Sequence, residues 1–145
     1  MTNSIFICIG TKNLIADSFG PRVGEKLLVD LKQYPWIEIY GTMKKPVHFK
    51  NARNFLQMLE NKEPKHVILI DSAFGKQENI GNTYVNFGGM EIGKAFGKSF
   101  YFPAHLNMKT VIGNQNHIPK WTEQQIDWLA QKVANKITKI VKELS

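Results

Sequence analysis

The sequence predicts an α/β protein, a single three-layer α/β/α domain whose mostly parallel sheet lies between helices. Short segments rich in isoleucine and valine alternate along the chain with amphipathic segments of helical period, which is typical of such a sheet. The chain has 145 residues, the length of one domain. It contains no linker, internal repeat or low-complexity segment, so we expect residues 1–145 to form one unit.

The first half of the chain predicts strand, helix, strand and helix in that order. Residues 4–10 ("SIFICIG") are an apolar run closed by glycine, as expected of a buried strand. Residues 19–32 repeat apolar side chains at helical spacing, and Pro21 is tolerated in the first turn, where its missing N–H would have no partner. Residues 36–41 ("WIEIYG") alternate like a strand, and residues 51–61 carry an apolar helical face.

The second half predicts three strands and a long final helix. Residues 65–75 ("KHVILIDSAFG") include consecutive apolar side chains, as expected of a central strand buried on both faces. Residues 83–87 and 108–113 are further strand segments. An amphipathic helix follows from Trp121 or Thr122 to Leu144, and Thr122 is suited to be its N-cap.

Composition and charge exclude several classes of protein. No apolar stretch is long enough to span a membrane, and the N-terminus lacks the layout of a secretory signal, so we expect a cytoplasmic protein without a membrane partner. Cys8 is the only cysteine and lies in an apolar strand, where it is expected to be inert. The net charge is +7, but the lysine row Lys132, Lys136 and Lys139 fits a solvated helix face. No nucleic-acid-binding motif accompanies it, so this activity is disfavoured.

Two aspartates mark the predicted site. Ligand sites of parallel sheets gather at the carboxyl ends of the strands. Asp17 lies in the loop after the first strand, residues 42–48 follow the second, and Asp71 ends the third, so all share one edge. Two carboxylates held close together can divide the roles of acid and base. Each also has a structural explanation, because Asp17 suits a helix N-cap and Asp71 could accept hydrogen bonds from the next loop.

Because two histidines lie in loops beside the strands of the predicted sheet, metal binding is one of the alternatives for this site. His48 and His105 could each complete a site with the aspartates, act as an acid or base, or hydrogen-bond within a loop. Asp17 and Asp71 together with one histidine would make the donor set of a divalent metal ion. The residues by themselves do not require a cofactor.

A glycine-rich stretch, residues 86–100 ("NFGGMEIGKAFGKSF"), matches no phosphate-binding pattern. We expect it to be a mobile flap over the site. Thr42 and His48, together with Gly88 and Gly89 of the flap, are predicted to contact the substrate.

Three motifs, "CIGT…ADSFGPRVGEKL", "YGTMKKPVH" and "ILIDSAFGK", resemble those of the YyaC-like sporulation proteins of spore-forming bacteria. The match runs from about Ile5 to Gly113, and the final helix fits by position. That family is similar in fold to the spore germination protease and to hydrogenase-maturation endopeptidases. The resemblance implies that Asp17 and Asp71 are catalytic, as in the germination protease. By similarity to the maturation peptidases, it also implies Asp17, Asp71 and His105 as the ligands of a divalent metal ion, nickel or zinc.

Two functions follow from this resemblance and stay open. The first is a sporulation- or germination-related endopeptidase-like hydrolase that acts on a protein or peptide through its paired aspartates, with or without a metal. The second is a non-catalytic protein that keeps the peptidase fold and binds a partner or peptide. The sequence does not decide between a monomer and a homo-oligomer.

Overall fold

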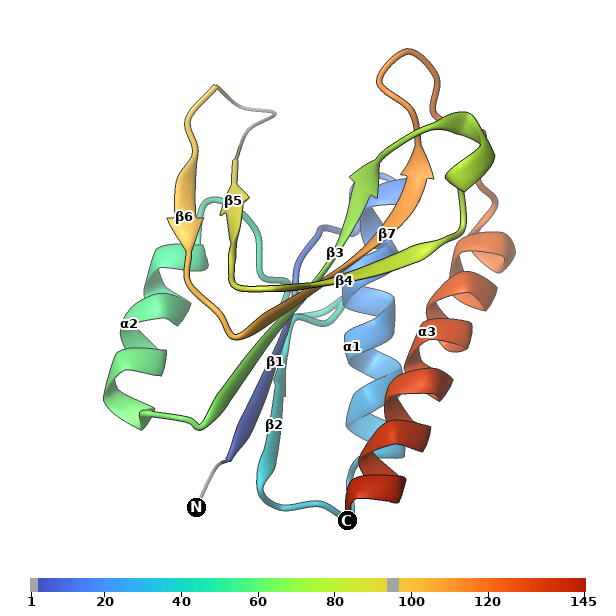
Figure 1. Cartoon of the computed structure of the whole chain (residues 1–145). Helices are drawn as coiled ribbons and strands as arrows, with labels where there is room; N and C mark the ends of the chain where they lie inside the picture. The colour runs from blue at the N-terminus through green and yellow to red at the C-terminus, as the bar shows by residue number, and fades with distance from the viewer. Residues whose placement is uncertain (1–2, 94–96) are drawn as a thin grey trace.

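A five-stranded sheet lies between helical layers in the computed structural model, which describes residues 3–93 and 97–145 (Figure 1). The strand order is β2 (Ile37–Tyr40), β1 (Ser4–Cys8), β3 (His66–Phe74), β7 (Leu106–Gly113) and β4 (Thr83–Phe87). The first four strands are parallel, and β4 pairs antiparallel with β7 at the edge. The predicted three-layer architecture is therefore confirmed.

Helices α1 (Phe19–Asp30) and α3 (Glu123–Leu144) cover one face of the sheet (Figure 1). The other face is covered by α2 (Ala52–Lys62) and by a small antiparallel hairpin, β5 (Met90–Ile92) and β6 (Phe100–Phe102). This hairpin occupies the stretch that we expected to be a flap, and residues 94–96 of that stretch lie outside the described residues. In the part of the chain that is described, no helix is long and apolar enough to cross a membrane.

Side chains of the central strands alternate between two apolar cores. Phe6, Cys8, Ile68 and Ile70 pack towards α1 and α3, whereas Ile5, Ile7, Val67 and Leu69 pack towards α2 and the hairpin. Both sets are buried, which explains why the strand segments are apolar without alternation. Burial also raises the pKa of the Cys8 thiol, so this cysteine is a core residue as predicted.

Glycines bring the start of α1 close to the strand ends. A Cβ atom on Gly20 would lie 2.0 Å from the carbonyl oxygen of Ile9, and one on Gly24 would lie 1.9 Å from that of Gly41. No real side chain tolerates such contacts with backbone. The glycines therefore set the distance between α1 and the sheet, and with it the position of Asp17 just before the helix.

The N-terminus of α3 provides a test of helix capping. Thr122 Oγ1 accepts a hydrogen bond from the N–H of Gln125 at 3.1 Å, and Gln125 Oε1 accepts one from the N–H of Thr122 at 3.0 Å. Thr122→Ala is expected to lower the free energy of unfolding by about 1 kcal/mol, measured by urea denaturation. Thr122→Ser keeps the acceptor and serves as the control. Equal losses in both variants would contradict the capping role.

Candidate functional site

The two aspartates lie in one cleft at the carboxyl end of β1. The cleft has a volume of about 560 Å³ and lies between the hairpin on one side and the last residues of β3 and β7 on the other. Asp17, His48 and Asp71 line it together with apolar and polar neighbours. These neighbours include Phe49, Phe74, Met90, Ile92, Lys109 and Gln115. The structure therefore brings together the two residues that we predicted to be catalytic.

Asp71 lies where β3 loses its neighbour on one side. The pairing of β1 with β3 ends at Cys8 and Ile70, and the N–H of Ile9 donates the last bond to the Ile70 carbonyl. Beyond this point β3 continues to Phe74, because β7 still pairs with it on the other side. The prediction that Asp71 ends its strand was therefore wrong. Asp71 lies within β3, just beyond the point where the neighbouring strand β1 ends.

Burial makes Asp71 a weak acid. The pKa of its carboxyl group is raised to about 8, mainly by desolvation and in addition by the nearby charge of Asp17. Two effects act in the opposite direction: the N–H of Ser72 donates to Asp71 Oδ1 at 2.7 Å, and Lys109 lies beside Asp71 in the register of β3 and β7. Asp71 is consequently protonated through most of the neutral range.

Asp17 is held by the loop that precedes α1. It lies in a short 3-10 turn (Ala16–Ser18), the N-cap of α1 is Ser18, and no side chain caps that helix. The carboxylate of Asp17 instead accepts a hydrogen bond from Thr11 Oγ1 at 3.0 Å, while the N–H of Thr11 donates to the Asp17 carbonyl at 3.1 Å. The interpretation of Asp17 as a helix cap was therefore wrong.

The pKa of Asp17 is raised by desolvation, but its neighbours oppose the rise. The hydrogen bonds from Thr11 and the charge of His48 both favour the ionised form. Asp71 has weaker compensation and faces the negative charge of Asp17. The cleft thus contains one carboxyl group that keeps its proton more readily than the other.

Removal of the Thr11 hydroxyl group tests this difference. Thr11→Val is expected to raise the pKa of Asp17, because the ionised carboxylate loses a hydrogen-bond donor while the valine side chain keeps a volume similar to that of threonine. The shift can be measured by NMR titration of the side-chain carboxyl carbons. Thr11→Ser keeps the donor and should leave the pKa close to that of the wild type. An unchanged value in Thr11→Val would show that the hydroxyl group does not stabilise the charge.

The two histidines occupy opposite ends of the sheet. His48 lines the cleft, and its Nδ1 accepts a hydrogen bond from the N–H of Lys50 at 3.2 Å, so a neutral imidazole carries its proton on Nε2. His105 precedes β7 instead, and its Nδ1 accepts from the N–H of Val67 at 2.9 Å. Val67 lies four residues before Asp71 on β3, roughly 13 Å along the strand. His105 therefore cannot complete a ligand set with the aspartates, and this prediction is corrected.

The donor set does not fit a resident nickel or zinc ion. Within residues 3–93 and 97–145, no three His, Cys, Asp or Glu side chains lie close enough together to hold a metal. His48 would also have to give up its Nε2 proton or its bond to Lys50 before it could ligate. The observed arrangement suits proton transfer better than metal binding.

Three residues predicted to contact the substrate, Thr42, Gly88 and Gly89, are not among the described residues that line the cleft. Thr42 closes a turn with Lys45, to which it makes two hydrogen bonds. Gly88 and Gly89 form the base of the hairpin, where both carbonyls accept from the Asn107 side chain. Conversely, Lys109 was missed as a site residue. Its register position beside Asp71 depends on the pairing of β3 with β7, which the sequence does not specify.

The fold is shared with proteins of known structure. Over 97% of the chain, the structure resembles the [NiFe] hydrogenase maturation protease HycI from Thermococcus kodakarensis KOD1, with a TM-score of 0.65, 19% identity and 93% of that chain covered. The [NiFe] hydrogenase maturation protease HybD from Thermococcus kodakarensis matches 96% of the chain, with a TM-score of 0.53, 12% identity and 99% of that chain covered. The chain thus has the fold of the hydrogenase maturation proteases.

The family follows from sequence. The chain belongs to the family described as "Protein of unknown function (DUF1256)", whose model matches residues 1–140. It is also 28% identical over 110 residues to the "Uncharacterized protein YyaC" of Bacillus subtilis (strain 168). That match covers 74% of this chain, but the chain spans only about half (52%) of the length of YyaC. The predicted resemblance to YyaC-like proteins is confirmed.

Proposed function

We propose that this protein is a peptidase-like hydrolase in which Asp17 is the general base and Asp71 the general acid. One observation carries the proposal: two carboxyl groups of unequal acidity line a single cleft. At neutral pH the ionised Asp17 can accept a proton and the neutral Asp71 can donate one. Such a pair provides both proton transfers that the hydrolysis of an amide bond requires.

The reaction balances with these two groups and water. Asp17 removes a proton from a water molecule, whose oxygen forms a bond to the scissile carbonyl carbon. Asp71 donates its proton to the amide nitrogen as the carbon–nitrogen bond breaks, which leaves a carboxylic acid and an amine. A proton then passes from Asp17 back to Asp71 to restore the starting state. Lys109 lies beside Asp71 and favours the carboxylate that forms transiently there.

The substrate that we propose is a protein or peptide. The two solved structures described above are named as maturation proteases, and the cleft combines the aspartates with apolar side chains such as Phe49, Phe74 and Ile92. A peptide chain offers the scissile amide together with apolar side chains for these contacts. A role in spore formation or germination, implied by the YyaC resemblance, belongs to the same proposal.

The test is cleavage of a fluorescence-quenched peptide library, followed by a pH profile on the best substrate. The rate is expected to rise as Asp17 ionises and to fall as Asp71 loses its proton near pH 8. Asp17→Asn should remove the acidic limb and lower kcat by roughly 10²–10⁴-fold. Asp127→Asn, on the surface of α3, serves as the control and should keep the wild-type rate. Cleavage by Asp17→Asn at the wild-type rate would overturn the proposal.

A further inference from the structure

Strand β4 leaves one side of the sheet open. It is the last strand in the order β2-β1-β3-β7-β4, and within residues 3–93 and 97–145 no strand pairs with its outer side. The register of β4 against β7 determines which main-chain groups face outwards. Main-chain hydrogen bonds join Gly88 to His105, which directly precedes β7, and Asn82 to Val111 of β7. By the antiparallel pattern, Tyr84 and Asn86 between them also direct their main-chain groups to β7. Thr83, Val85 and Phe87 therefore turn their N–H and C=O groups away from the sheet.

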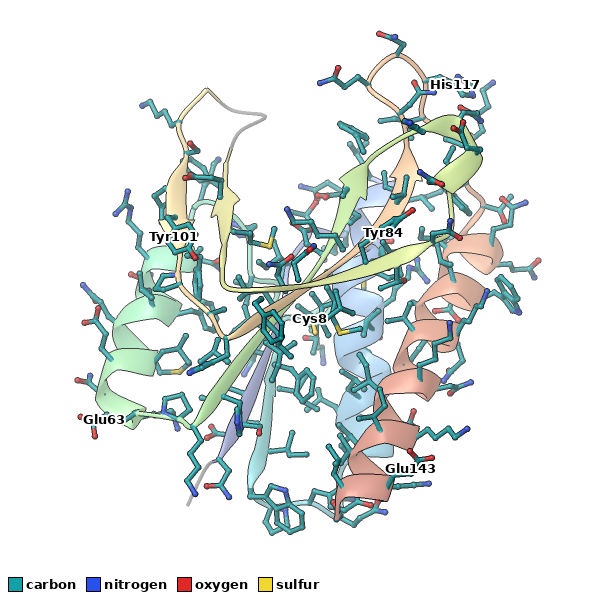
Figure 2. All side chains as sticks on the ribbon, in the orientation of Figure 1. Cys8, Glu63, Tyr84, Tyr101, His117 and Glu143 are labelled. Atoms are coloured by element: carbon teal, nitrogen blue, oxygen red, sulfur yellow. The ribbon has the colours of Figure 1, made fainter. Side chains whose placement is uncertain are left out.

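The side chains of this edge are unusually apolar. Tyr84, Val85 and Phe87 are 45%, 56% and 94% exposed, and Tyr84 projects from the strand in Figure 2. Residues 80–88 contain no charged residue and no proline. Edge strands are normally protected from pairing by such residues, by a bulge or by a cover. Among the residues that the structure describes, the β4 edge has no such protection, so an added strand would find both hydrogen-bonding groups and apolar contacts.

Lysines beside β4 determine what kind of strand fits. Gly81 to Tyr84 and the facing side of α3 enclose a groove of about 330 Å³. Lys132 and Lys136 line this groove, and none of the described residues that line it is acidic. Lys132 lies over the Trp128 ring at 5.4 Å, and within the described ranges neither lysine forms an ion pair. The groove therefore has uncompensated positive charge.

This charge disfavours a second copy as the occupant. Antiparallel pairing of β4 with β4 of another copy requires a two-fold axis, which places both α3 helices on the same face of the joined sheet. The strand facing β4 would then be residues 80–88 of the second copy, which contain no acidic side chain to pair with Lys132 and Lys136. An acidic segment of another protein would instead compensate them.

We propose that the outer edge of β4 binds an extended acidic segment of a partner protein, which adds antiparallel to β4 as a sixth strand of the sheet. In this register the acidic side chains of the partner lie opposite Gly81 and Thr83, near the two lysines. Its apolar side chains lie opposite Val85 and Phe87. Main-chain bonds supply the affinity, and the alternate side chains supply the specificity. The site is separate from the aspartate cleft, so it does not depend on the proposed hydrolase activity.

A labelled octapeptide of sequence TFTVTETE, blocked at both ends, tests this register by fluorescence anisotropy. Its phenylalanine, valine and two glutamates fall opposite Phe87, Val85, Thr83 and Gly81 in antiparallel pairing. We expect saturable binding to the wild type that weakens with added salt. Val85→Pro removes an outward N–H at a position where an edge strand tolerates proline, and it should weaken binding roughly tenfold. The double variant Lys132→Glu/Lys136→Glu should weaken it roughly fivefold.

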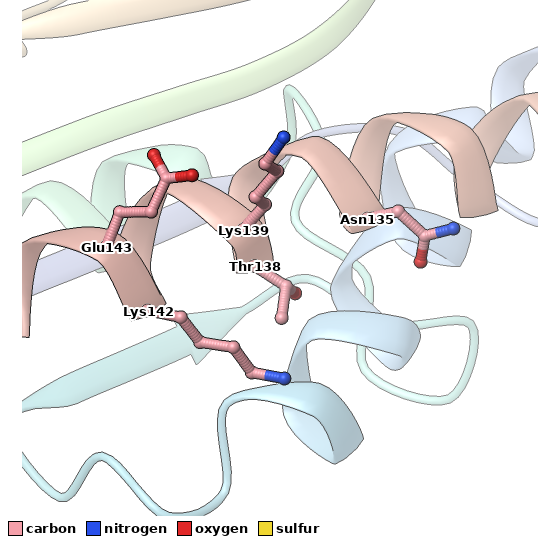
Figure 3. A pocket seen from close by; sticks show the side chains of 5 residues that line it. All are labelled: Asn135, Thr138, Lys139, Lys142 and Glu143. Carbon is pink, nitrogen blue, oxygen red and sulfur yellow. The ribbon is translucent and has the colours of Figure 1, made fainter.

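The matched control changes two other lysines of α3. Lys139 and Lys142 lie near the C-terminal end of this helix, beside a different hollow (Figure 3). Lys139→Glu/Lys142→Glu has the same net charge as the groove variant and should bind the peptide like the wild type. The charge-reversed peptide TFTVTKTK should bind at least about fivefold more weakly than TFTVTETE.

Four results would overturn the inference: no binding of TFTVTETE to the wild type, equal binding by Val85→Pro, equal losses in the two lysine double variants, or equal binding of the charge-reversed peptide. Sedimentation velocity tests the competing occupant. A wild-type dimer that Val85→Pro converts to a monomer would assign the edge to a second copy and would also overturn the inference.

Discussion

Asp71→Asn is expected to abolish peptide hydrolysis and, at the same time, to make the folded protein more stable at neutral pH. The loss of activity follows from the loss of the proton donor, and a general acid contributes roughly 10²–10⁴-fold to the rate. The gain in stability follows from burial. The folded protein holds Asp71 where its carboxylate is poorly solvated, whereas asparagine is neutral at every pH.

The pH dependence of this effect has a definite sign. In the unfolded chain Asp71 titrates with a pKa of roughly 4, and in the folded protein its pKa is about 8. Between these values the folded state binds more protons, so the free energy of unfolding contributed by Asp71 falls as pH rises. Above about pH 8, Asp71 is ionised in both states, and the folded protein carries the full free-energy cost of the buried carboxylate. Asp71→Asn removes it, and the stability advantage of the variant should grow from about pH 4 to pH 8.

Thermal unfolding across this pH range provides the measurement. We expect Asp71→Asn to unfold at a higher temperature than the wild type at pH 8, by about 2–4 °C for each kcal/mol of the penalty that the substitution removes. Asp127→Asn makes the same chemical change where Arg22 and Lys26 lower the pKa, so it should slightly destabilise the protein. A variant of Asp71 that is inactive but less stable at pH 8 would show that the carboxylate is not under electrostatic strain.

Gly20→Ala should damage both stability and the site. The added methyl group would lie 2.0 Å from the Ile9 carbonyl oxygen, so the first turn of α1 must move away from the end of β1. Overpacking of this kind costs about 1–3 kcal/mol, more than the roughly 1 kcal/mol that alanine gains over glycine in a helix. Because Asp17 lies three residues earlier in the chain, the same movement should displace it from Asp71 and lower kcat.

Urea denaturation and steady-state kinetics on one sample measure both effects. Gly75→Ala is the matched control, because its methyl group would meet only the Val111 side chain, at 3.1 Å, and no backbone atom. We expect it to lose less stability than Gly20→Ala and to retain the wild-type rate. If Gly20→Ala is as stable and as active as the wild type, the close packing of α1 does not position Asp17.

The elements of the fold could be predicted because their signals are local. The period of the apolar residues distinguishes strands such as 4–10 and 65–75 from the helices that follow them. The side chain of Thr122 specifies the start of α3 through a hydrogen bond three residues away. The hairpin of β5 and β6 could not be predicted in this way, because its strands have three residues each and lie in a glycine-rich stretch.

The sequence by itself determined the three helices, the segments that form the five-stranded sheet and the two aspartates as candidates, since each depends on neighbours in the chain. Tertiary structure decided which side chains contact one another and which of them reach the cleft. Asp17 bonds to Thr11 and does not cap α1, His48 enters the cleft, and His105 lies at the opposite edge of the sheet. The raised pKa of Asp71 was also decided there, because desolvation and the charges of Asp17 and Lys109 depend on segments that only folding brings together.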